Sequence, residues 1–172
     1  SWFVPVSLLA IYLVLVVLLR SLVAPLYLVF SVIVSFGATF GISIFVFQVI
    51  LSHSGVAYSN GVWMFIFLVA LGADYNIFVM SRIREATQQK GLRPGIAIAV
   101  GRTGSVITSA GIILAGTFAV LTTLPLRDLF QLGFAVMLGV LIDTFVVRAF
   151  LVPSMTAMFG RWSWWPNMRG NT

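Results

Sequence analysis

Two aspartates stand inside long apolar stretches of this sequence, at Asp74 and Asp143. Asp74 belongs to the segment GADYN at 72–76, in which Tyr75 follows it directly. An ionisable side chain in hydrocarbon is energetically costly, and it usually marks an ion or substrate pathway. Such a carboxyl can carry a proton, act as an acid in hydrolysis, or hold helices together. The Tyr75 phenol can donate to the carboxylate or accept from the protonated acid.

Both aspartates need partners from elsewhere in the fold. Arg82 is about 12 Å from Asp74 along a helix axis, so it cannot neutralise Asp74 directly. Arg148 follows Asp143 by five residues, which is about 140° around an α-helix. We therefore expect Arg148 to be a poor partner for Asp143 and to extend to the cytoplasmic interface. Gly139, one turn before Asp143, leaves space for another helix or a water. The residues expected on the Asp74 side of its helix are mostly apolar: Phe67, Ala70, Leu71, Phe78 and Ser81.

Five apolar segments must position these residues. The chain has 172 residues, of which 60% are hydrophobic and only 8% charged, and this composition excludes a soluble domain. Breaks at charged, Gly and Pro residues predict spans at about 3–19, 25–51, 61–80, 104–124 and 129–159. The fold class is therefore an all-α membrane protein with five transmembrane helices. Residues 1–161 would form the bundle, with a loop at 81–103 and a tail at 162–172.

The Lys and Arg residues predict how the bundle is oriented. The loop at 81–103 carries Arg82, Arg84, Lys90, Arg93 and Arg102, whereas the loop around His53 carries no Lys or Arg. The positive-inside rule places the basic loop and the C-terminus in the cytoplasm, and the N-terminus outside. Residues 96–100 are expected to lie along the interface before the fourth span. Trp162, Trp164 and Trp165 follow the last span, where an interfacial aromatic belt is expected.

Small and hydroxyl residues mark candidate packing faces. Small residues let helices approach closely, and hydroxyls can bridge to neighbouring helices. In the second span Gly37 and Gly41 have GxxxG spacing, and we favour a packing role there too. The stripe on the fourth span, for which packing is also favoured, consists of Ser105, Thr108, Ser109, Ile112, Gly116 and Ala119.

Several kinds of chemistry find no motif in the sequence. Cysteine is absent, and there is no Gly-rich phosphate loop, HExxH motif, nucleophile elbow or metal-spaced His/Cys set. We therefore expect no cofactor and no metal. If the chain belongs to a transporter, as considered below, we expect protons to be the coupling ion. The net charge of +6 is not read as affinity for nucleic acid, because so few residues are charged. The start, without Met or a basic leader, suggests that the chain begins inside a larger protein.

Three functions fit these features. A proton-coupled transporter would protonate Asp74 and gain about 2.3 kcal/mol per charge per 100 mV of membrane potential. An intramembrane aspartyl protease would use Asp74 and Asp143 as a dyad, although their sequence contexts differ from the expected GxGD pattern. A non-catalytic scaffold or sensor would bind lipid between its helices. The physics of the sequence favours the transporter, so we do not expect an enzyme.

Long motifs carry a family resemblance. They are GADYNIFVMSRIR at 72–84, GRTGSVITSAG at 101–111 and GVLIDTFVVR at 139–148, with Pro153 and the closing Trp164-Trp165-Pro166. Together they resemble the C-terminal half of the mycobacterial membrane protein large (MmpL) family. This family belongs to the resistance-nodulation-division (RND) superfamily. The resemblance extends over nearly the whole chain.

The resemblance implies a bacterial plasma-membrane exporter of lipids or other hydrophobic molecules, driven by the proton motive force. It implies twelve spans in two repeats, of which this chain would hold the last five. Asp74 and Tyr75 would form half of a proton relay facing an equivalent pair in the missing N-terminal repeat. The supporting groups would be Asp143, Ser105, Thr108 and Ser109. Expected partners are membrane lipids, a lipid-like substrate and a possible second copy of the protein.

Overall fold

The computed structural model describes residues 2–52 and 58–165 of the chain. These residues are helical almost throughout, and no strand occurs among them. The prediction of an all-α membrane protein is confirmed. The elements in chain order, with π-helical or 3₁₀ segments labelled η, are α1 Phe3–Leu19, α2 Val23–Phe45, η1 Val46–Ile50, α3 Tyr58–Lys90, α4 Leu92–Leu121, α5 Arg127–Ile142, η2 Asp143–Leu151, α6 Val152–Phe159 and η3 Gly160–Trp164.

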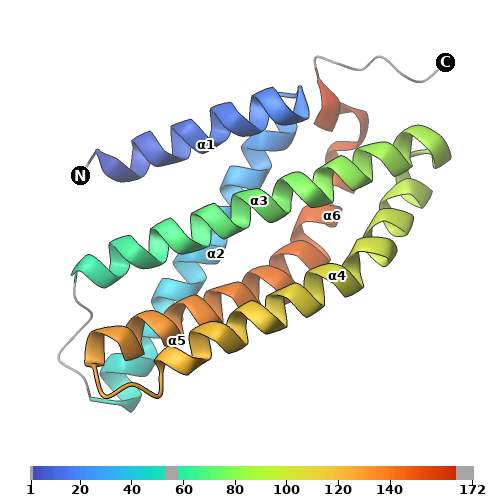
Figure 1. Cartoon of the computed structure of the whole chain (residues 1–172). Coiled ribbons are helices and arrows are strands. Elements are labelled where there is room, and N and C mark those ends of the chain that lie inside the picture. The colour runs from blue at the N-terminus through green and yellow to red at the C-terminus, as the bar shows by residue number, and fades with distance from the viewer. Residues whose placement is uncertain (1, 53–57, 166–172) are drawn as a thin grey trace.

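Helix α3 is central to the bundle. It packs against α1, α2, α4 and α5, and α4 also packs against α5. Figure 1 shows α3, α4 and α5 running side by side, with α2 crossing behind α3 and α5. Helix α3 therefore has neighbouring helices on several of its sides.

In the described part of the chain, four helical stretches are long and apolar enough to cross a membrane, by length and composition. They are Val23–Ile50, Ser59–Lys90, Leu92–Leu121 and Arg127–Trp164. Helix α1 is shorter, with 17 residues. At 1.5 Å per residue it is about 26 Å long, close to the thickness of a hydrocarbon core.

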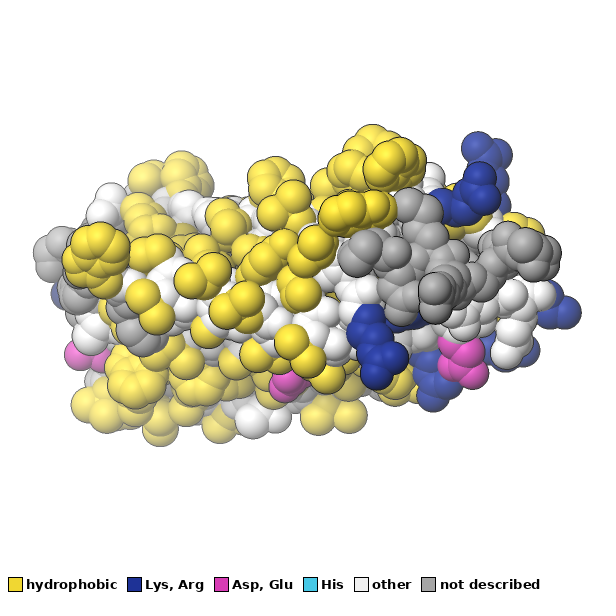
Figure 2. Space-filling view, turned by 90° about the horizontal axis from the view of Figure 1, so that it is seen from above, with side chains coloured by type: hydrophobic (Ala, Val, Ile, Leu, Met, Phe, Trp, Pro, Cys, Tyr) yellow, Lys and Arg dark blue, Asp and Glu magenta, His cyan; other side chains and the backbone are white. Residues whose placement is uncertain are grey.

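The distribution of side chains suits a lipid surround. Many large apolar side chains lie on the outside, such as Val17 at 73% and Ile113 at 70% exposure. Figure 2 shows hydrophobic side chains over most of one face, with most of its Lys and Arg at one end. Polar side chains instead lie inside, among them Thr39, Asn76 and Gln131. In lipid, polar groups are stabilised by neighbouring helices and apolar groups need no burial, so this pattern favours a membrane location.

At the end of the bundle that carries most of the Lys and Arg residues, called the basic end here, Arg84 contacts several elements. Its Nη1 donates a hydrogen bond of 2.7 Å to the carbonyl oxygen of Leu19 at the end of α1. Its guanidinium carbon lies 5.5 Å from the ring of Trp164. The backbone N–H of Leu22 donates to the carbonyl oxygen of Trp165 at 2.9 Å. The α1–α2 junction, the end of α3 and the C-terminal turn therefore lie at the same end.

The segment 81–103, expected as a loop, is helical except at one residue. Helix α3 continues to Lys90, and α4 begins at Leu92. Only Gly91 breaks the helix, with a φ of 85° that favours glycine. The expectation failed because charged residues mark where a helix leaves hydrocarbon, and a helix can continue in water beyond that point. The proposed interfacial stretch at 96–100 is part of α4.

The small residues that pack are mostly not those that the sequence suggested. On α4 the buried face carries Thr103, Ile107, Gly111 and Ala115, whereas Ser105, Ser109, Ile112 and Gly116 are exposed. A Cβ at Gly37 or Gly41 would meet no atom of the described residues within 4 Å. At Gly139 the expectation of space for another helix is confirmed, because a Cβ there would lie 2.4 Å from the Leu68 side chain.

Gly95 carries a prediction about the α3–α4 hairpin. A Cβ there would lie 2.5 Å from the Cα of Thr87, a backbone atom that cannot rotate away. We expect Gly95→Ala to destabilise the protein by about 1–3 kcal/mol, because the helices must separate. Thermal unfolding of the detergent-purified protein measures the effect.

Gly101→Ala is the matched control for this change. Gly101 lies in the same helix and a Cβ there would meet nothing within 4 Å. Alanine at that position should be neutral or stabilising by up to about 1 kcal/mol, from helix propensity alone. Equal unfolding temperatures for the two variants would contradict the proposed close packing at Gly95.

Candidate functional site

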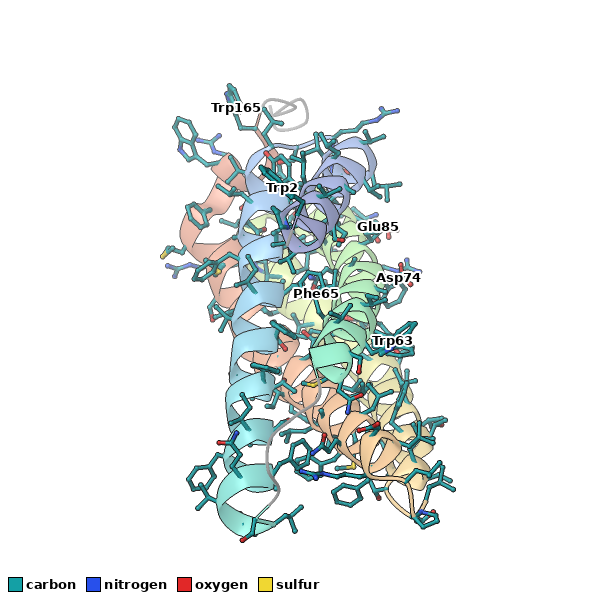
Figure 3. All side chains as sticks on the ribbon, turned by 90° about the vertical axis from the view of Figure 1, so that its left-hand side faces the viewer. Trp2, Trp63, Phe65, Asp74, Glu85 and Trp165 are labelled. Atoms are coloured by element: carbon teal, nitrogen blue, oxygen red, sulfur yellow. The ribbon has the colours of Figure 1, made fainter. Side chains whose placement is uncertain are left out.

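Asp74 lies on the face of α3 that points away from the rest of the bundle. It is exposed, and it has no hydrogen bond or ion pair with any other described residue. Figure 3 shows it pointing away from the bundle, as Trp63 does, whereas the buried Phe65 points inward. The apolar surround that the sequence suggested is therefore not built by this part of the chain.

The neighbours of Asp74 on α3 divide between two sides. Phe67 and Leu71 pack against the core formed by α4 and α5. Phe78, one turn after Asp74, is exposed like Asp74 itself. Any partner for the carboxyl must therefore come from water, lipid or another part of the protein.

Tyr75 lies about 100° around α3 from Asp74 and contacts the last span. Its side chain is half-buried. The guanidinium carbon of Arg148 lies 4.1 Å from the centroid of its ring. This is a close cation–π contact, in which the ring face attracts the positive charge. Two adjacent residues of α3 thus face solvent or lipid on one side and a buried cation on the other.

Arg148 forms a buried ion pair with Asp143. The Arg148 Nη2 donates to Oδ2 of Asp143, and the two side chains are only 3% and 10% exposed. This corrects the expectation that Arg148 is a poor partner and extends to the interface. Residues 143–151 are π-helical, and the N–H of Val152 donates to the carbonyl of Val147. The wider π turn, with its i to i+5 hydrogen bonds, brings residues five apart towards the same side.

A small cavity lies beside Arg148. Its volume is about 70 Å³, which is enough space for water. Hydroxyl residues Thr103, Thr108 and Thr144 help to line it, together with Arg148. The Nε and Nη1 atoms of Arg148 are buried, and neither has a hydrogen-bond partner within residues 2–52 and 58–165. Water in this cavity is the simplest way to satisfy them, because buried donors without partners are strongly unfavourable.

The predicted supporting residues separate into two groups. Asp143 and Thr108 lie at or beside the buried ion pair. Ser105 and Ser109 are exposed on α4, and the Ser109 hydroxyl donates to the Ser105 carbonyl at 2.8 Å. The structure therefore brings the first two to Arg148 and leaves the two serines on the outer surface.

Sequence reasoning missed Arg148 and Asn76. Asn76 is fully buried, and neither its amide nitrogen nor its amide oxygen has a hydrogen-bond partner among the described residues. Its place in an apolar run directly after Tyr75 was a usable signal. For Arg148 no such signal existed, because nothing in the residue pattern indicates a π-helical segment.

The arrangement as a whole links an exposed acid to a buried charge pair. Asp74 is an exposed carboxyl at the surface of α3. Tyr75, the next residue, contacts Arg148, and Asp143 holds Arg148 in place. The exposed carboxyl of Asp74 is therefore one residue away from a side chain that contacts a buried, paired cation.

Comparison with known protein families finds a match over nearly the whole chain. The model of the MMPL family matches residues 2–172. The chain belongs to the MMPL family. The resemblance to MmpL proteins in the sequence is thereby confirmed.

The curated relatives of this MMPL-family chain are transport and membrane proteins. It is 47% identical to the membrane protein ActII-3 of Streptomyces coelicolor, over 95% of the chain and 23% of the relative. It is 45% identical to the transport protein MmpL12 of Mycobacterium tuberculosis, over 93% of the chain and 14% of the relative. It is 44% identical to an apo-petrobactin exporter of Bacillus anthracis, over 95% and 22%. The chain thus spans less than a quarter of the length of each.

Proposed function

We propose that the protein is an RND-type membrane exporter of lipid-like or other hydrophobic molecules, driven by the proton gradient. This chain would contribute half of its proton relay. The observation that carries the proposal is the step from Asp74 to Tyr75, which places an exposed carboxyl next to a phenol ring stacked on a buried ion pair. Membership of the MMPL family and similarity to proteins named as transporters support the export function.

Asp74 is the proton carrier in this proposal. A proton entering from the outer side binds the carboxylate and removes its charge. The neutral acid no longer attracts positive charge. A different arrangement of the helices is therefore preferred when Asp74 is protonated. Release of the proton to the cytoplasm restores the carboxylate. Each proton that crosses with the field contributes about 2.3 kcal/mol per 100 mV.

Tyr75 and Arg148 transmit the change in this proposal. The cation–π contact holds the α3 backbone at a set distance from the last span. Asp143 keeps the guanidinium oriented, because an ionised carboxylate makes a stronger hydrogen bond than a neutral acceptor does. The cavity beside Arg148 would admit water from the basic end of the bundle, which the positive-inside rule predicts to be cytoplasmic.

The exposed side of Asp74 would face the other repeat of the complete transporter. Repeat-built transporters place their ion site at the interface between repeats. Asp74 lies on a surface of α3 that no other described element covers, as such an interface requires.

The aspartyl protease is less well supported. A protease dyad needs two carboxyls that share one proton. Here Asp143 is buried against Arg148, whereas Asp74 is exposed on the outer side of α3 and does not contact it. The two carboxyls are therefore in different surroundings, and one of them is already paired with a cation.

Reconstitution of the complete protein tests the proposal. Vesicles made of the source cell's lipids plus a fluorescent lipid analogue would be given an imposed proton gradient. We expect the analogue to change leaflet or leave the membrane at least about tenfold faster with the gradient than after a protonophore. ATP should have no effect. Movement that is unchanged by the protonophore would exclude proton coupling.

A further inference from the structure

Hydroxyl side chains are buried in a row along one side of α2. They are spaced four residues apart, each is at most 3% exposed, and they are Ser31, Ser35, Thr39 and Ser43. Residues four apart form a ridge that is inclined to the helix axis. Because α2 crosses α3 and α5 at an angle, such a ridge can follow the seam between them (Figure 1). We call these four side chains the hydroxyl row.

Contacts beyond both ends of the hydroxyl row place it in this seam. Tyr27 precedes the row by one turn, and its hydroxyl lies 3.0 Å from the Thr156 hydroxyl and 3.7 Å from the Met80 sulfur. Phe47 follows the row by one turn, and its ring centroid lies 5.4 Å from that of Phe134 on α5. The row therefore runs between α2, α3 and the last span, from near the basic end to the opposite end, called the outer end here.

Asn76 of α3 faces the same seam. A Cβ at Gly72, one turn before it, would lie 3.1 Å from the Val32 side chain. Met80, one turn after it, contacts Tyr27. Residues four apart share a face of a helix, so Asn76 faces the stretch of α2 between Tyr27 and Val32, where the hydroxyl row begins.

Several polar atoms in this seam are enclosed without a partner. The Oγ atoms of Ser35 and Ser43 and both amide atoms of Asn76 are buried, and none has a hydrogen bond to a described residue. Unpaired polar groups inside a membrane protein are strongly unfavourable. Because the bundle already encloses these atoms, no further domain or repeat can reach them. A molecule as small as water can.

We propose that this seam binds internal water and conducts protons from the outer end to the depth of Tyr75, the neighbour of Asn76. The route serves the proposed proton relay and rests on it. A proton passes along the water by exchange: each molecule accepts one proton and donates another, so Asn76 and the serines do not ionise. Phe47 closes the outer end, within the π-helical segment η1, and π-helical turns are frequent at functional sites.

Asn76→Leu tests the route in the complete protein, in vesicles loaded with a pH-sensitive dye. Leucine keeps the branched shape of asparagine without its polar atoms. Proton flux should fall roughly tenfold, which is the usual effect of one hydrogen bond. The unfolding temperature should not fall, because the amide has no protein partner to lose. Ser35→Ala/Ser43→Ala removes two more unpaired groups with little change of volume, and it should lower the flux similarly.

Two matched controls lie on the same helix as Asn76. Asn60 is also a buried asparagine, but its amide nitrogen donates to the Asp128 carbonyl and to Oε1 of Gln131, both at 3.3 Å. Asn60→Leu should therefore lower the unfolding temperature. Thr87→Val removes a buried hydroxyl at the contact with α4 and should leave the flux unchanged. An equal loss of flux in Thr87→Val and Asn76→Leu would overturn the proposal.

Phe47→Leu should act in the opposite direction. A smaller side chain loosens the closure of the outer end, so proton flux should rise severalfold, whereas general damage to the bundle would lower it. A fall in flux would overturn the role of Phe47 as the gate. Unchanged flux in both Asn76→Leu and Ser35→Ala/Ser43→Ala would overturn the route.

Hydroxyl-radical labelling tests the water itself, without a proton gradient. Radicals generated by X-rays from water oxidise side chains beside that water, and mass spectrometry detects the product. Met80 is fully buried one turn from Asn76, and we expect it to be labelled in the complete protein and much less in Asn76→Leu. An unlabelled Met80 would overturn the water site. Absence of proton flux in the unchanged protein would instead refute the proposed function.

Discussion

Under the proposed relay, replacing Asp74 with asparagine should lower proton flux through the complete protein roughly a hundredfold or more, to the level of protein-free vesicles. Asparagine has nearly the same size but cannot bind and release a proton. Asp74 is exposed and has no partner among the described residues, so the change should alter stability by less than about 0.5 kcal/mol. Vesicles of the source cell's lipids, loaded with a pH-sensitive dye, measure the flux.

Two further variants separate titration from general effects of charge. Asp128→Asn removes an exposed carboxyl from the first turn of α5 and should leave the flux unchanged. Asp74→Glu keeps a titratable carboxyl one methylene further out and should retain part of the flux. Full flux in Asp74→Asn would remove Asp74 from the relay, whatever the role of the buried ion pair.

Arg148→Met should destabilise the protein by about 3–5 kcal/mol, because it leaves Asp143 buried without a cation. Methionine fills much of the same volume, so the loss comes chiefly from the unpaired carboxyl and less from a cavity. The contact with the Tyr75 ring is lost as well. A lower unfolding temperature of the detergent-purified protein is the expected measurement.

The double variant Asp143→Leu/Arg148→Met distinguishes structure from function. Replacing both members of a buried ion pair with apolar residues is often neutral or stabilising, so the unfolding temperature should recover. If the pair serves the relay, this stable double variant should show no proton flux. A double variant that recovers both stability and flux would show that the pair is only structural. A double variant as unstable as Arg148→Met would contradict the pairing itself.

Much of the fold could be predicted from hydrophobicity alone. Apolar runs of sufficient length, interrupted by charged and Gly/Pro residues, identified the five helical segments, and four of them meet the length and composition expected of a membrane span. The reason is physical: the free energy of placing a helix in hydrocarbon is nearly a sum over its residues. The same argument indicated Asp74 as a candidate functional residue. A carboxyl in an apolar run is energetically costly, and this can be recognised from the local sequence without knowing the rest of the fold.

The faces that pack could not be predicted in this way. Lipid tails are as apolar as a protein core, so polarity does not decide which side of a membrane helix turns inward. Helix α4 has small residues on two sides, and only the fit of Gly111 against Thr144 shows which is buried. Gly37 and Gly41 have the right spacing and yet meet nothing in the described chain.

The aspartates show the same division. Their types and their positions in apolar sequence were determined by the sequence itself, and so was the adjacent Tyr75. Only the tertiary structure decided that Asp74 faces outward while Asp143 is buried with Arg148. That difference depends on a π-helical turn and on contacts between residues far apart in the chain. Both depend on how the helices pack against one another. A sum of the membrane-insertion free energies of single residues does not include packing.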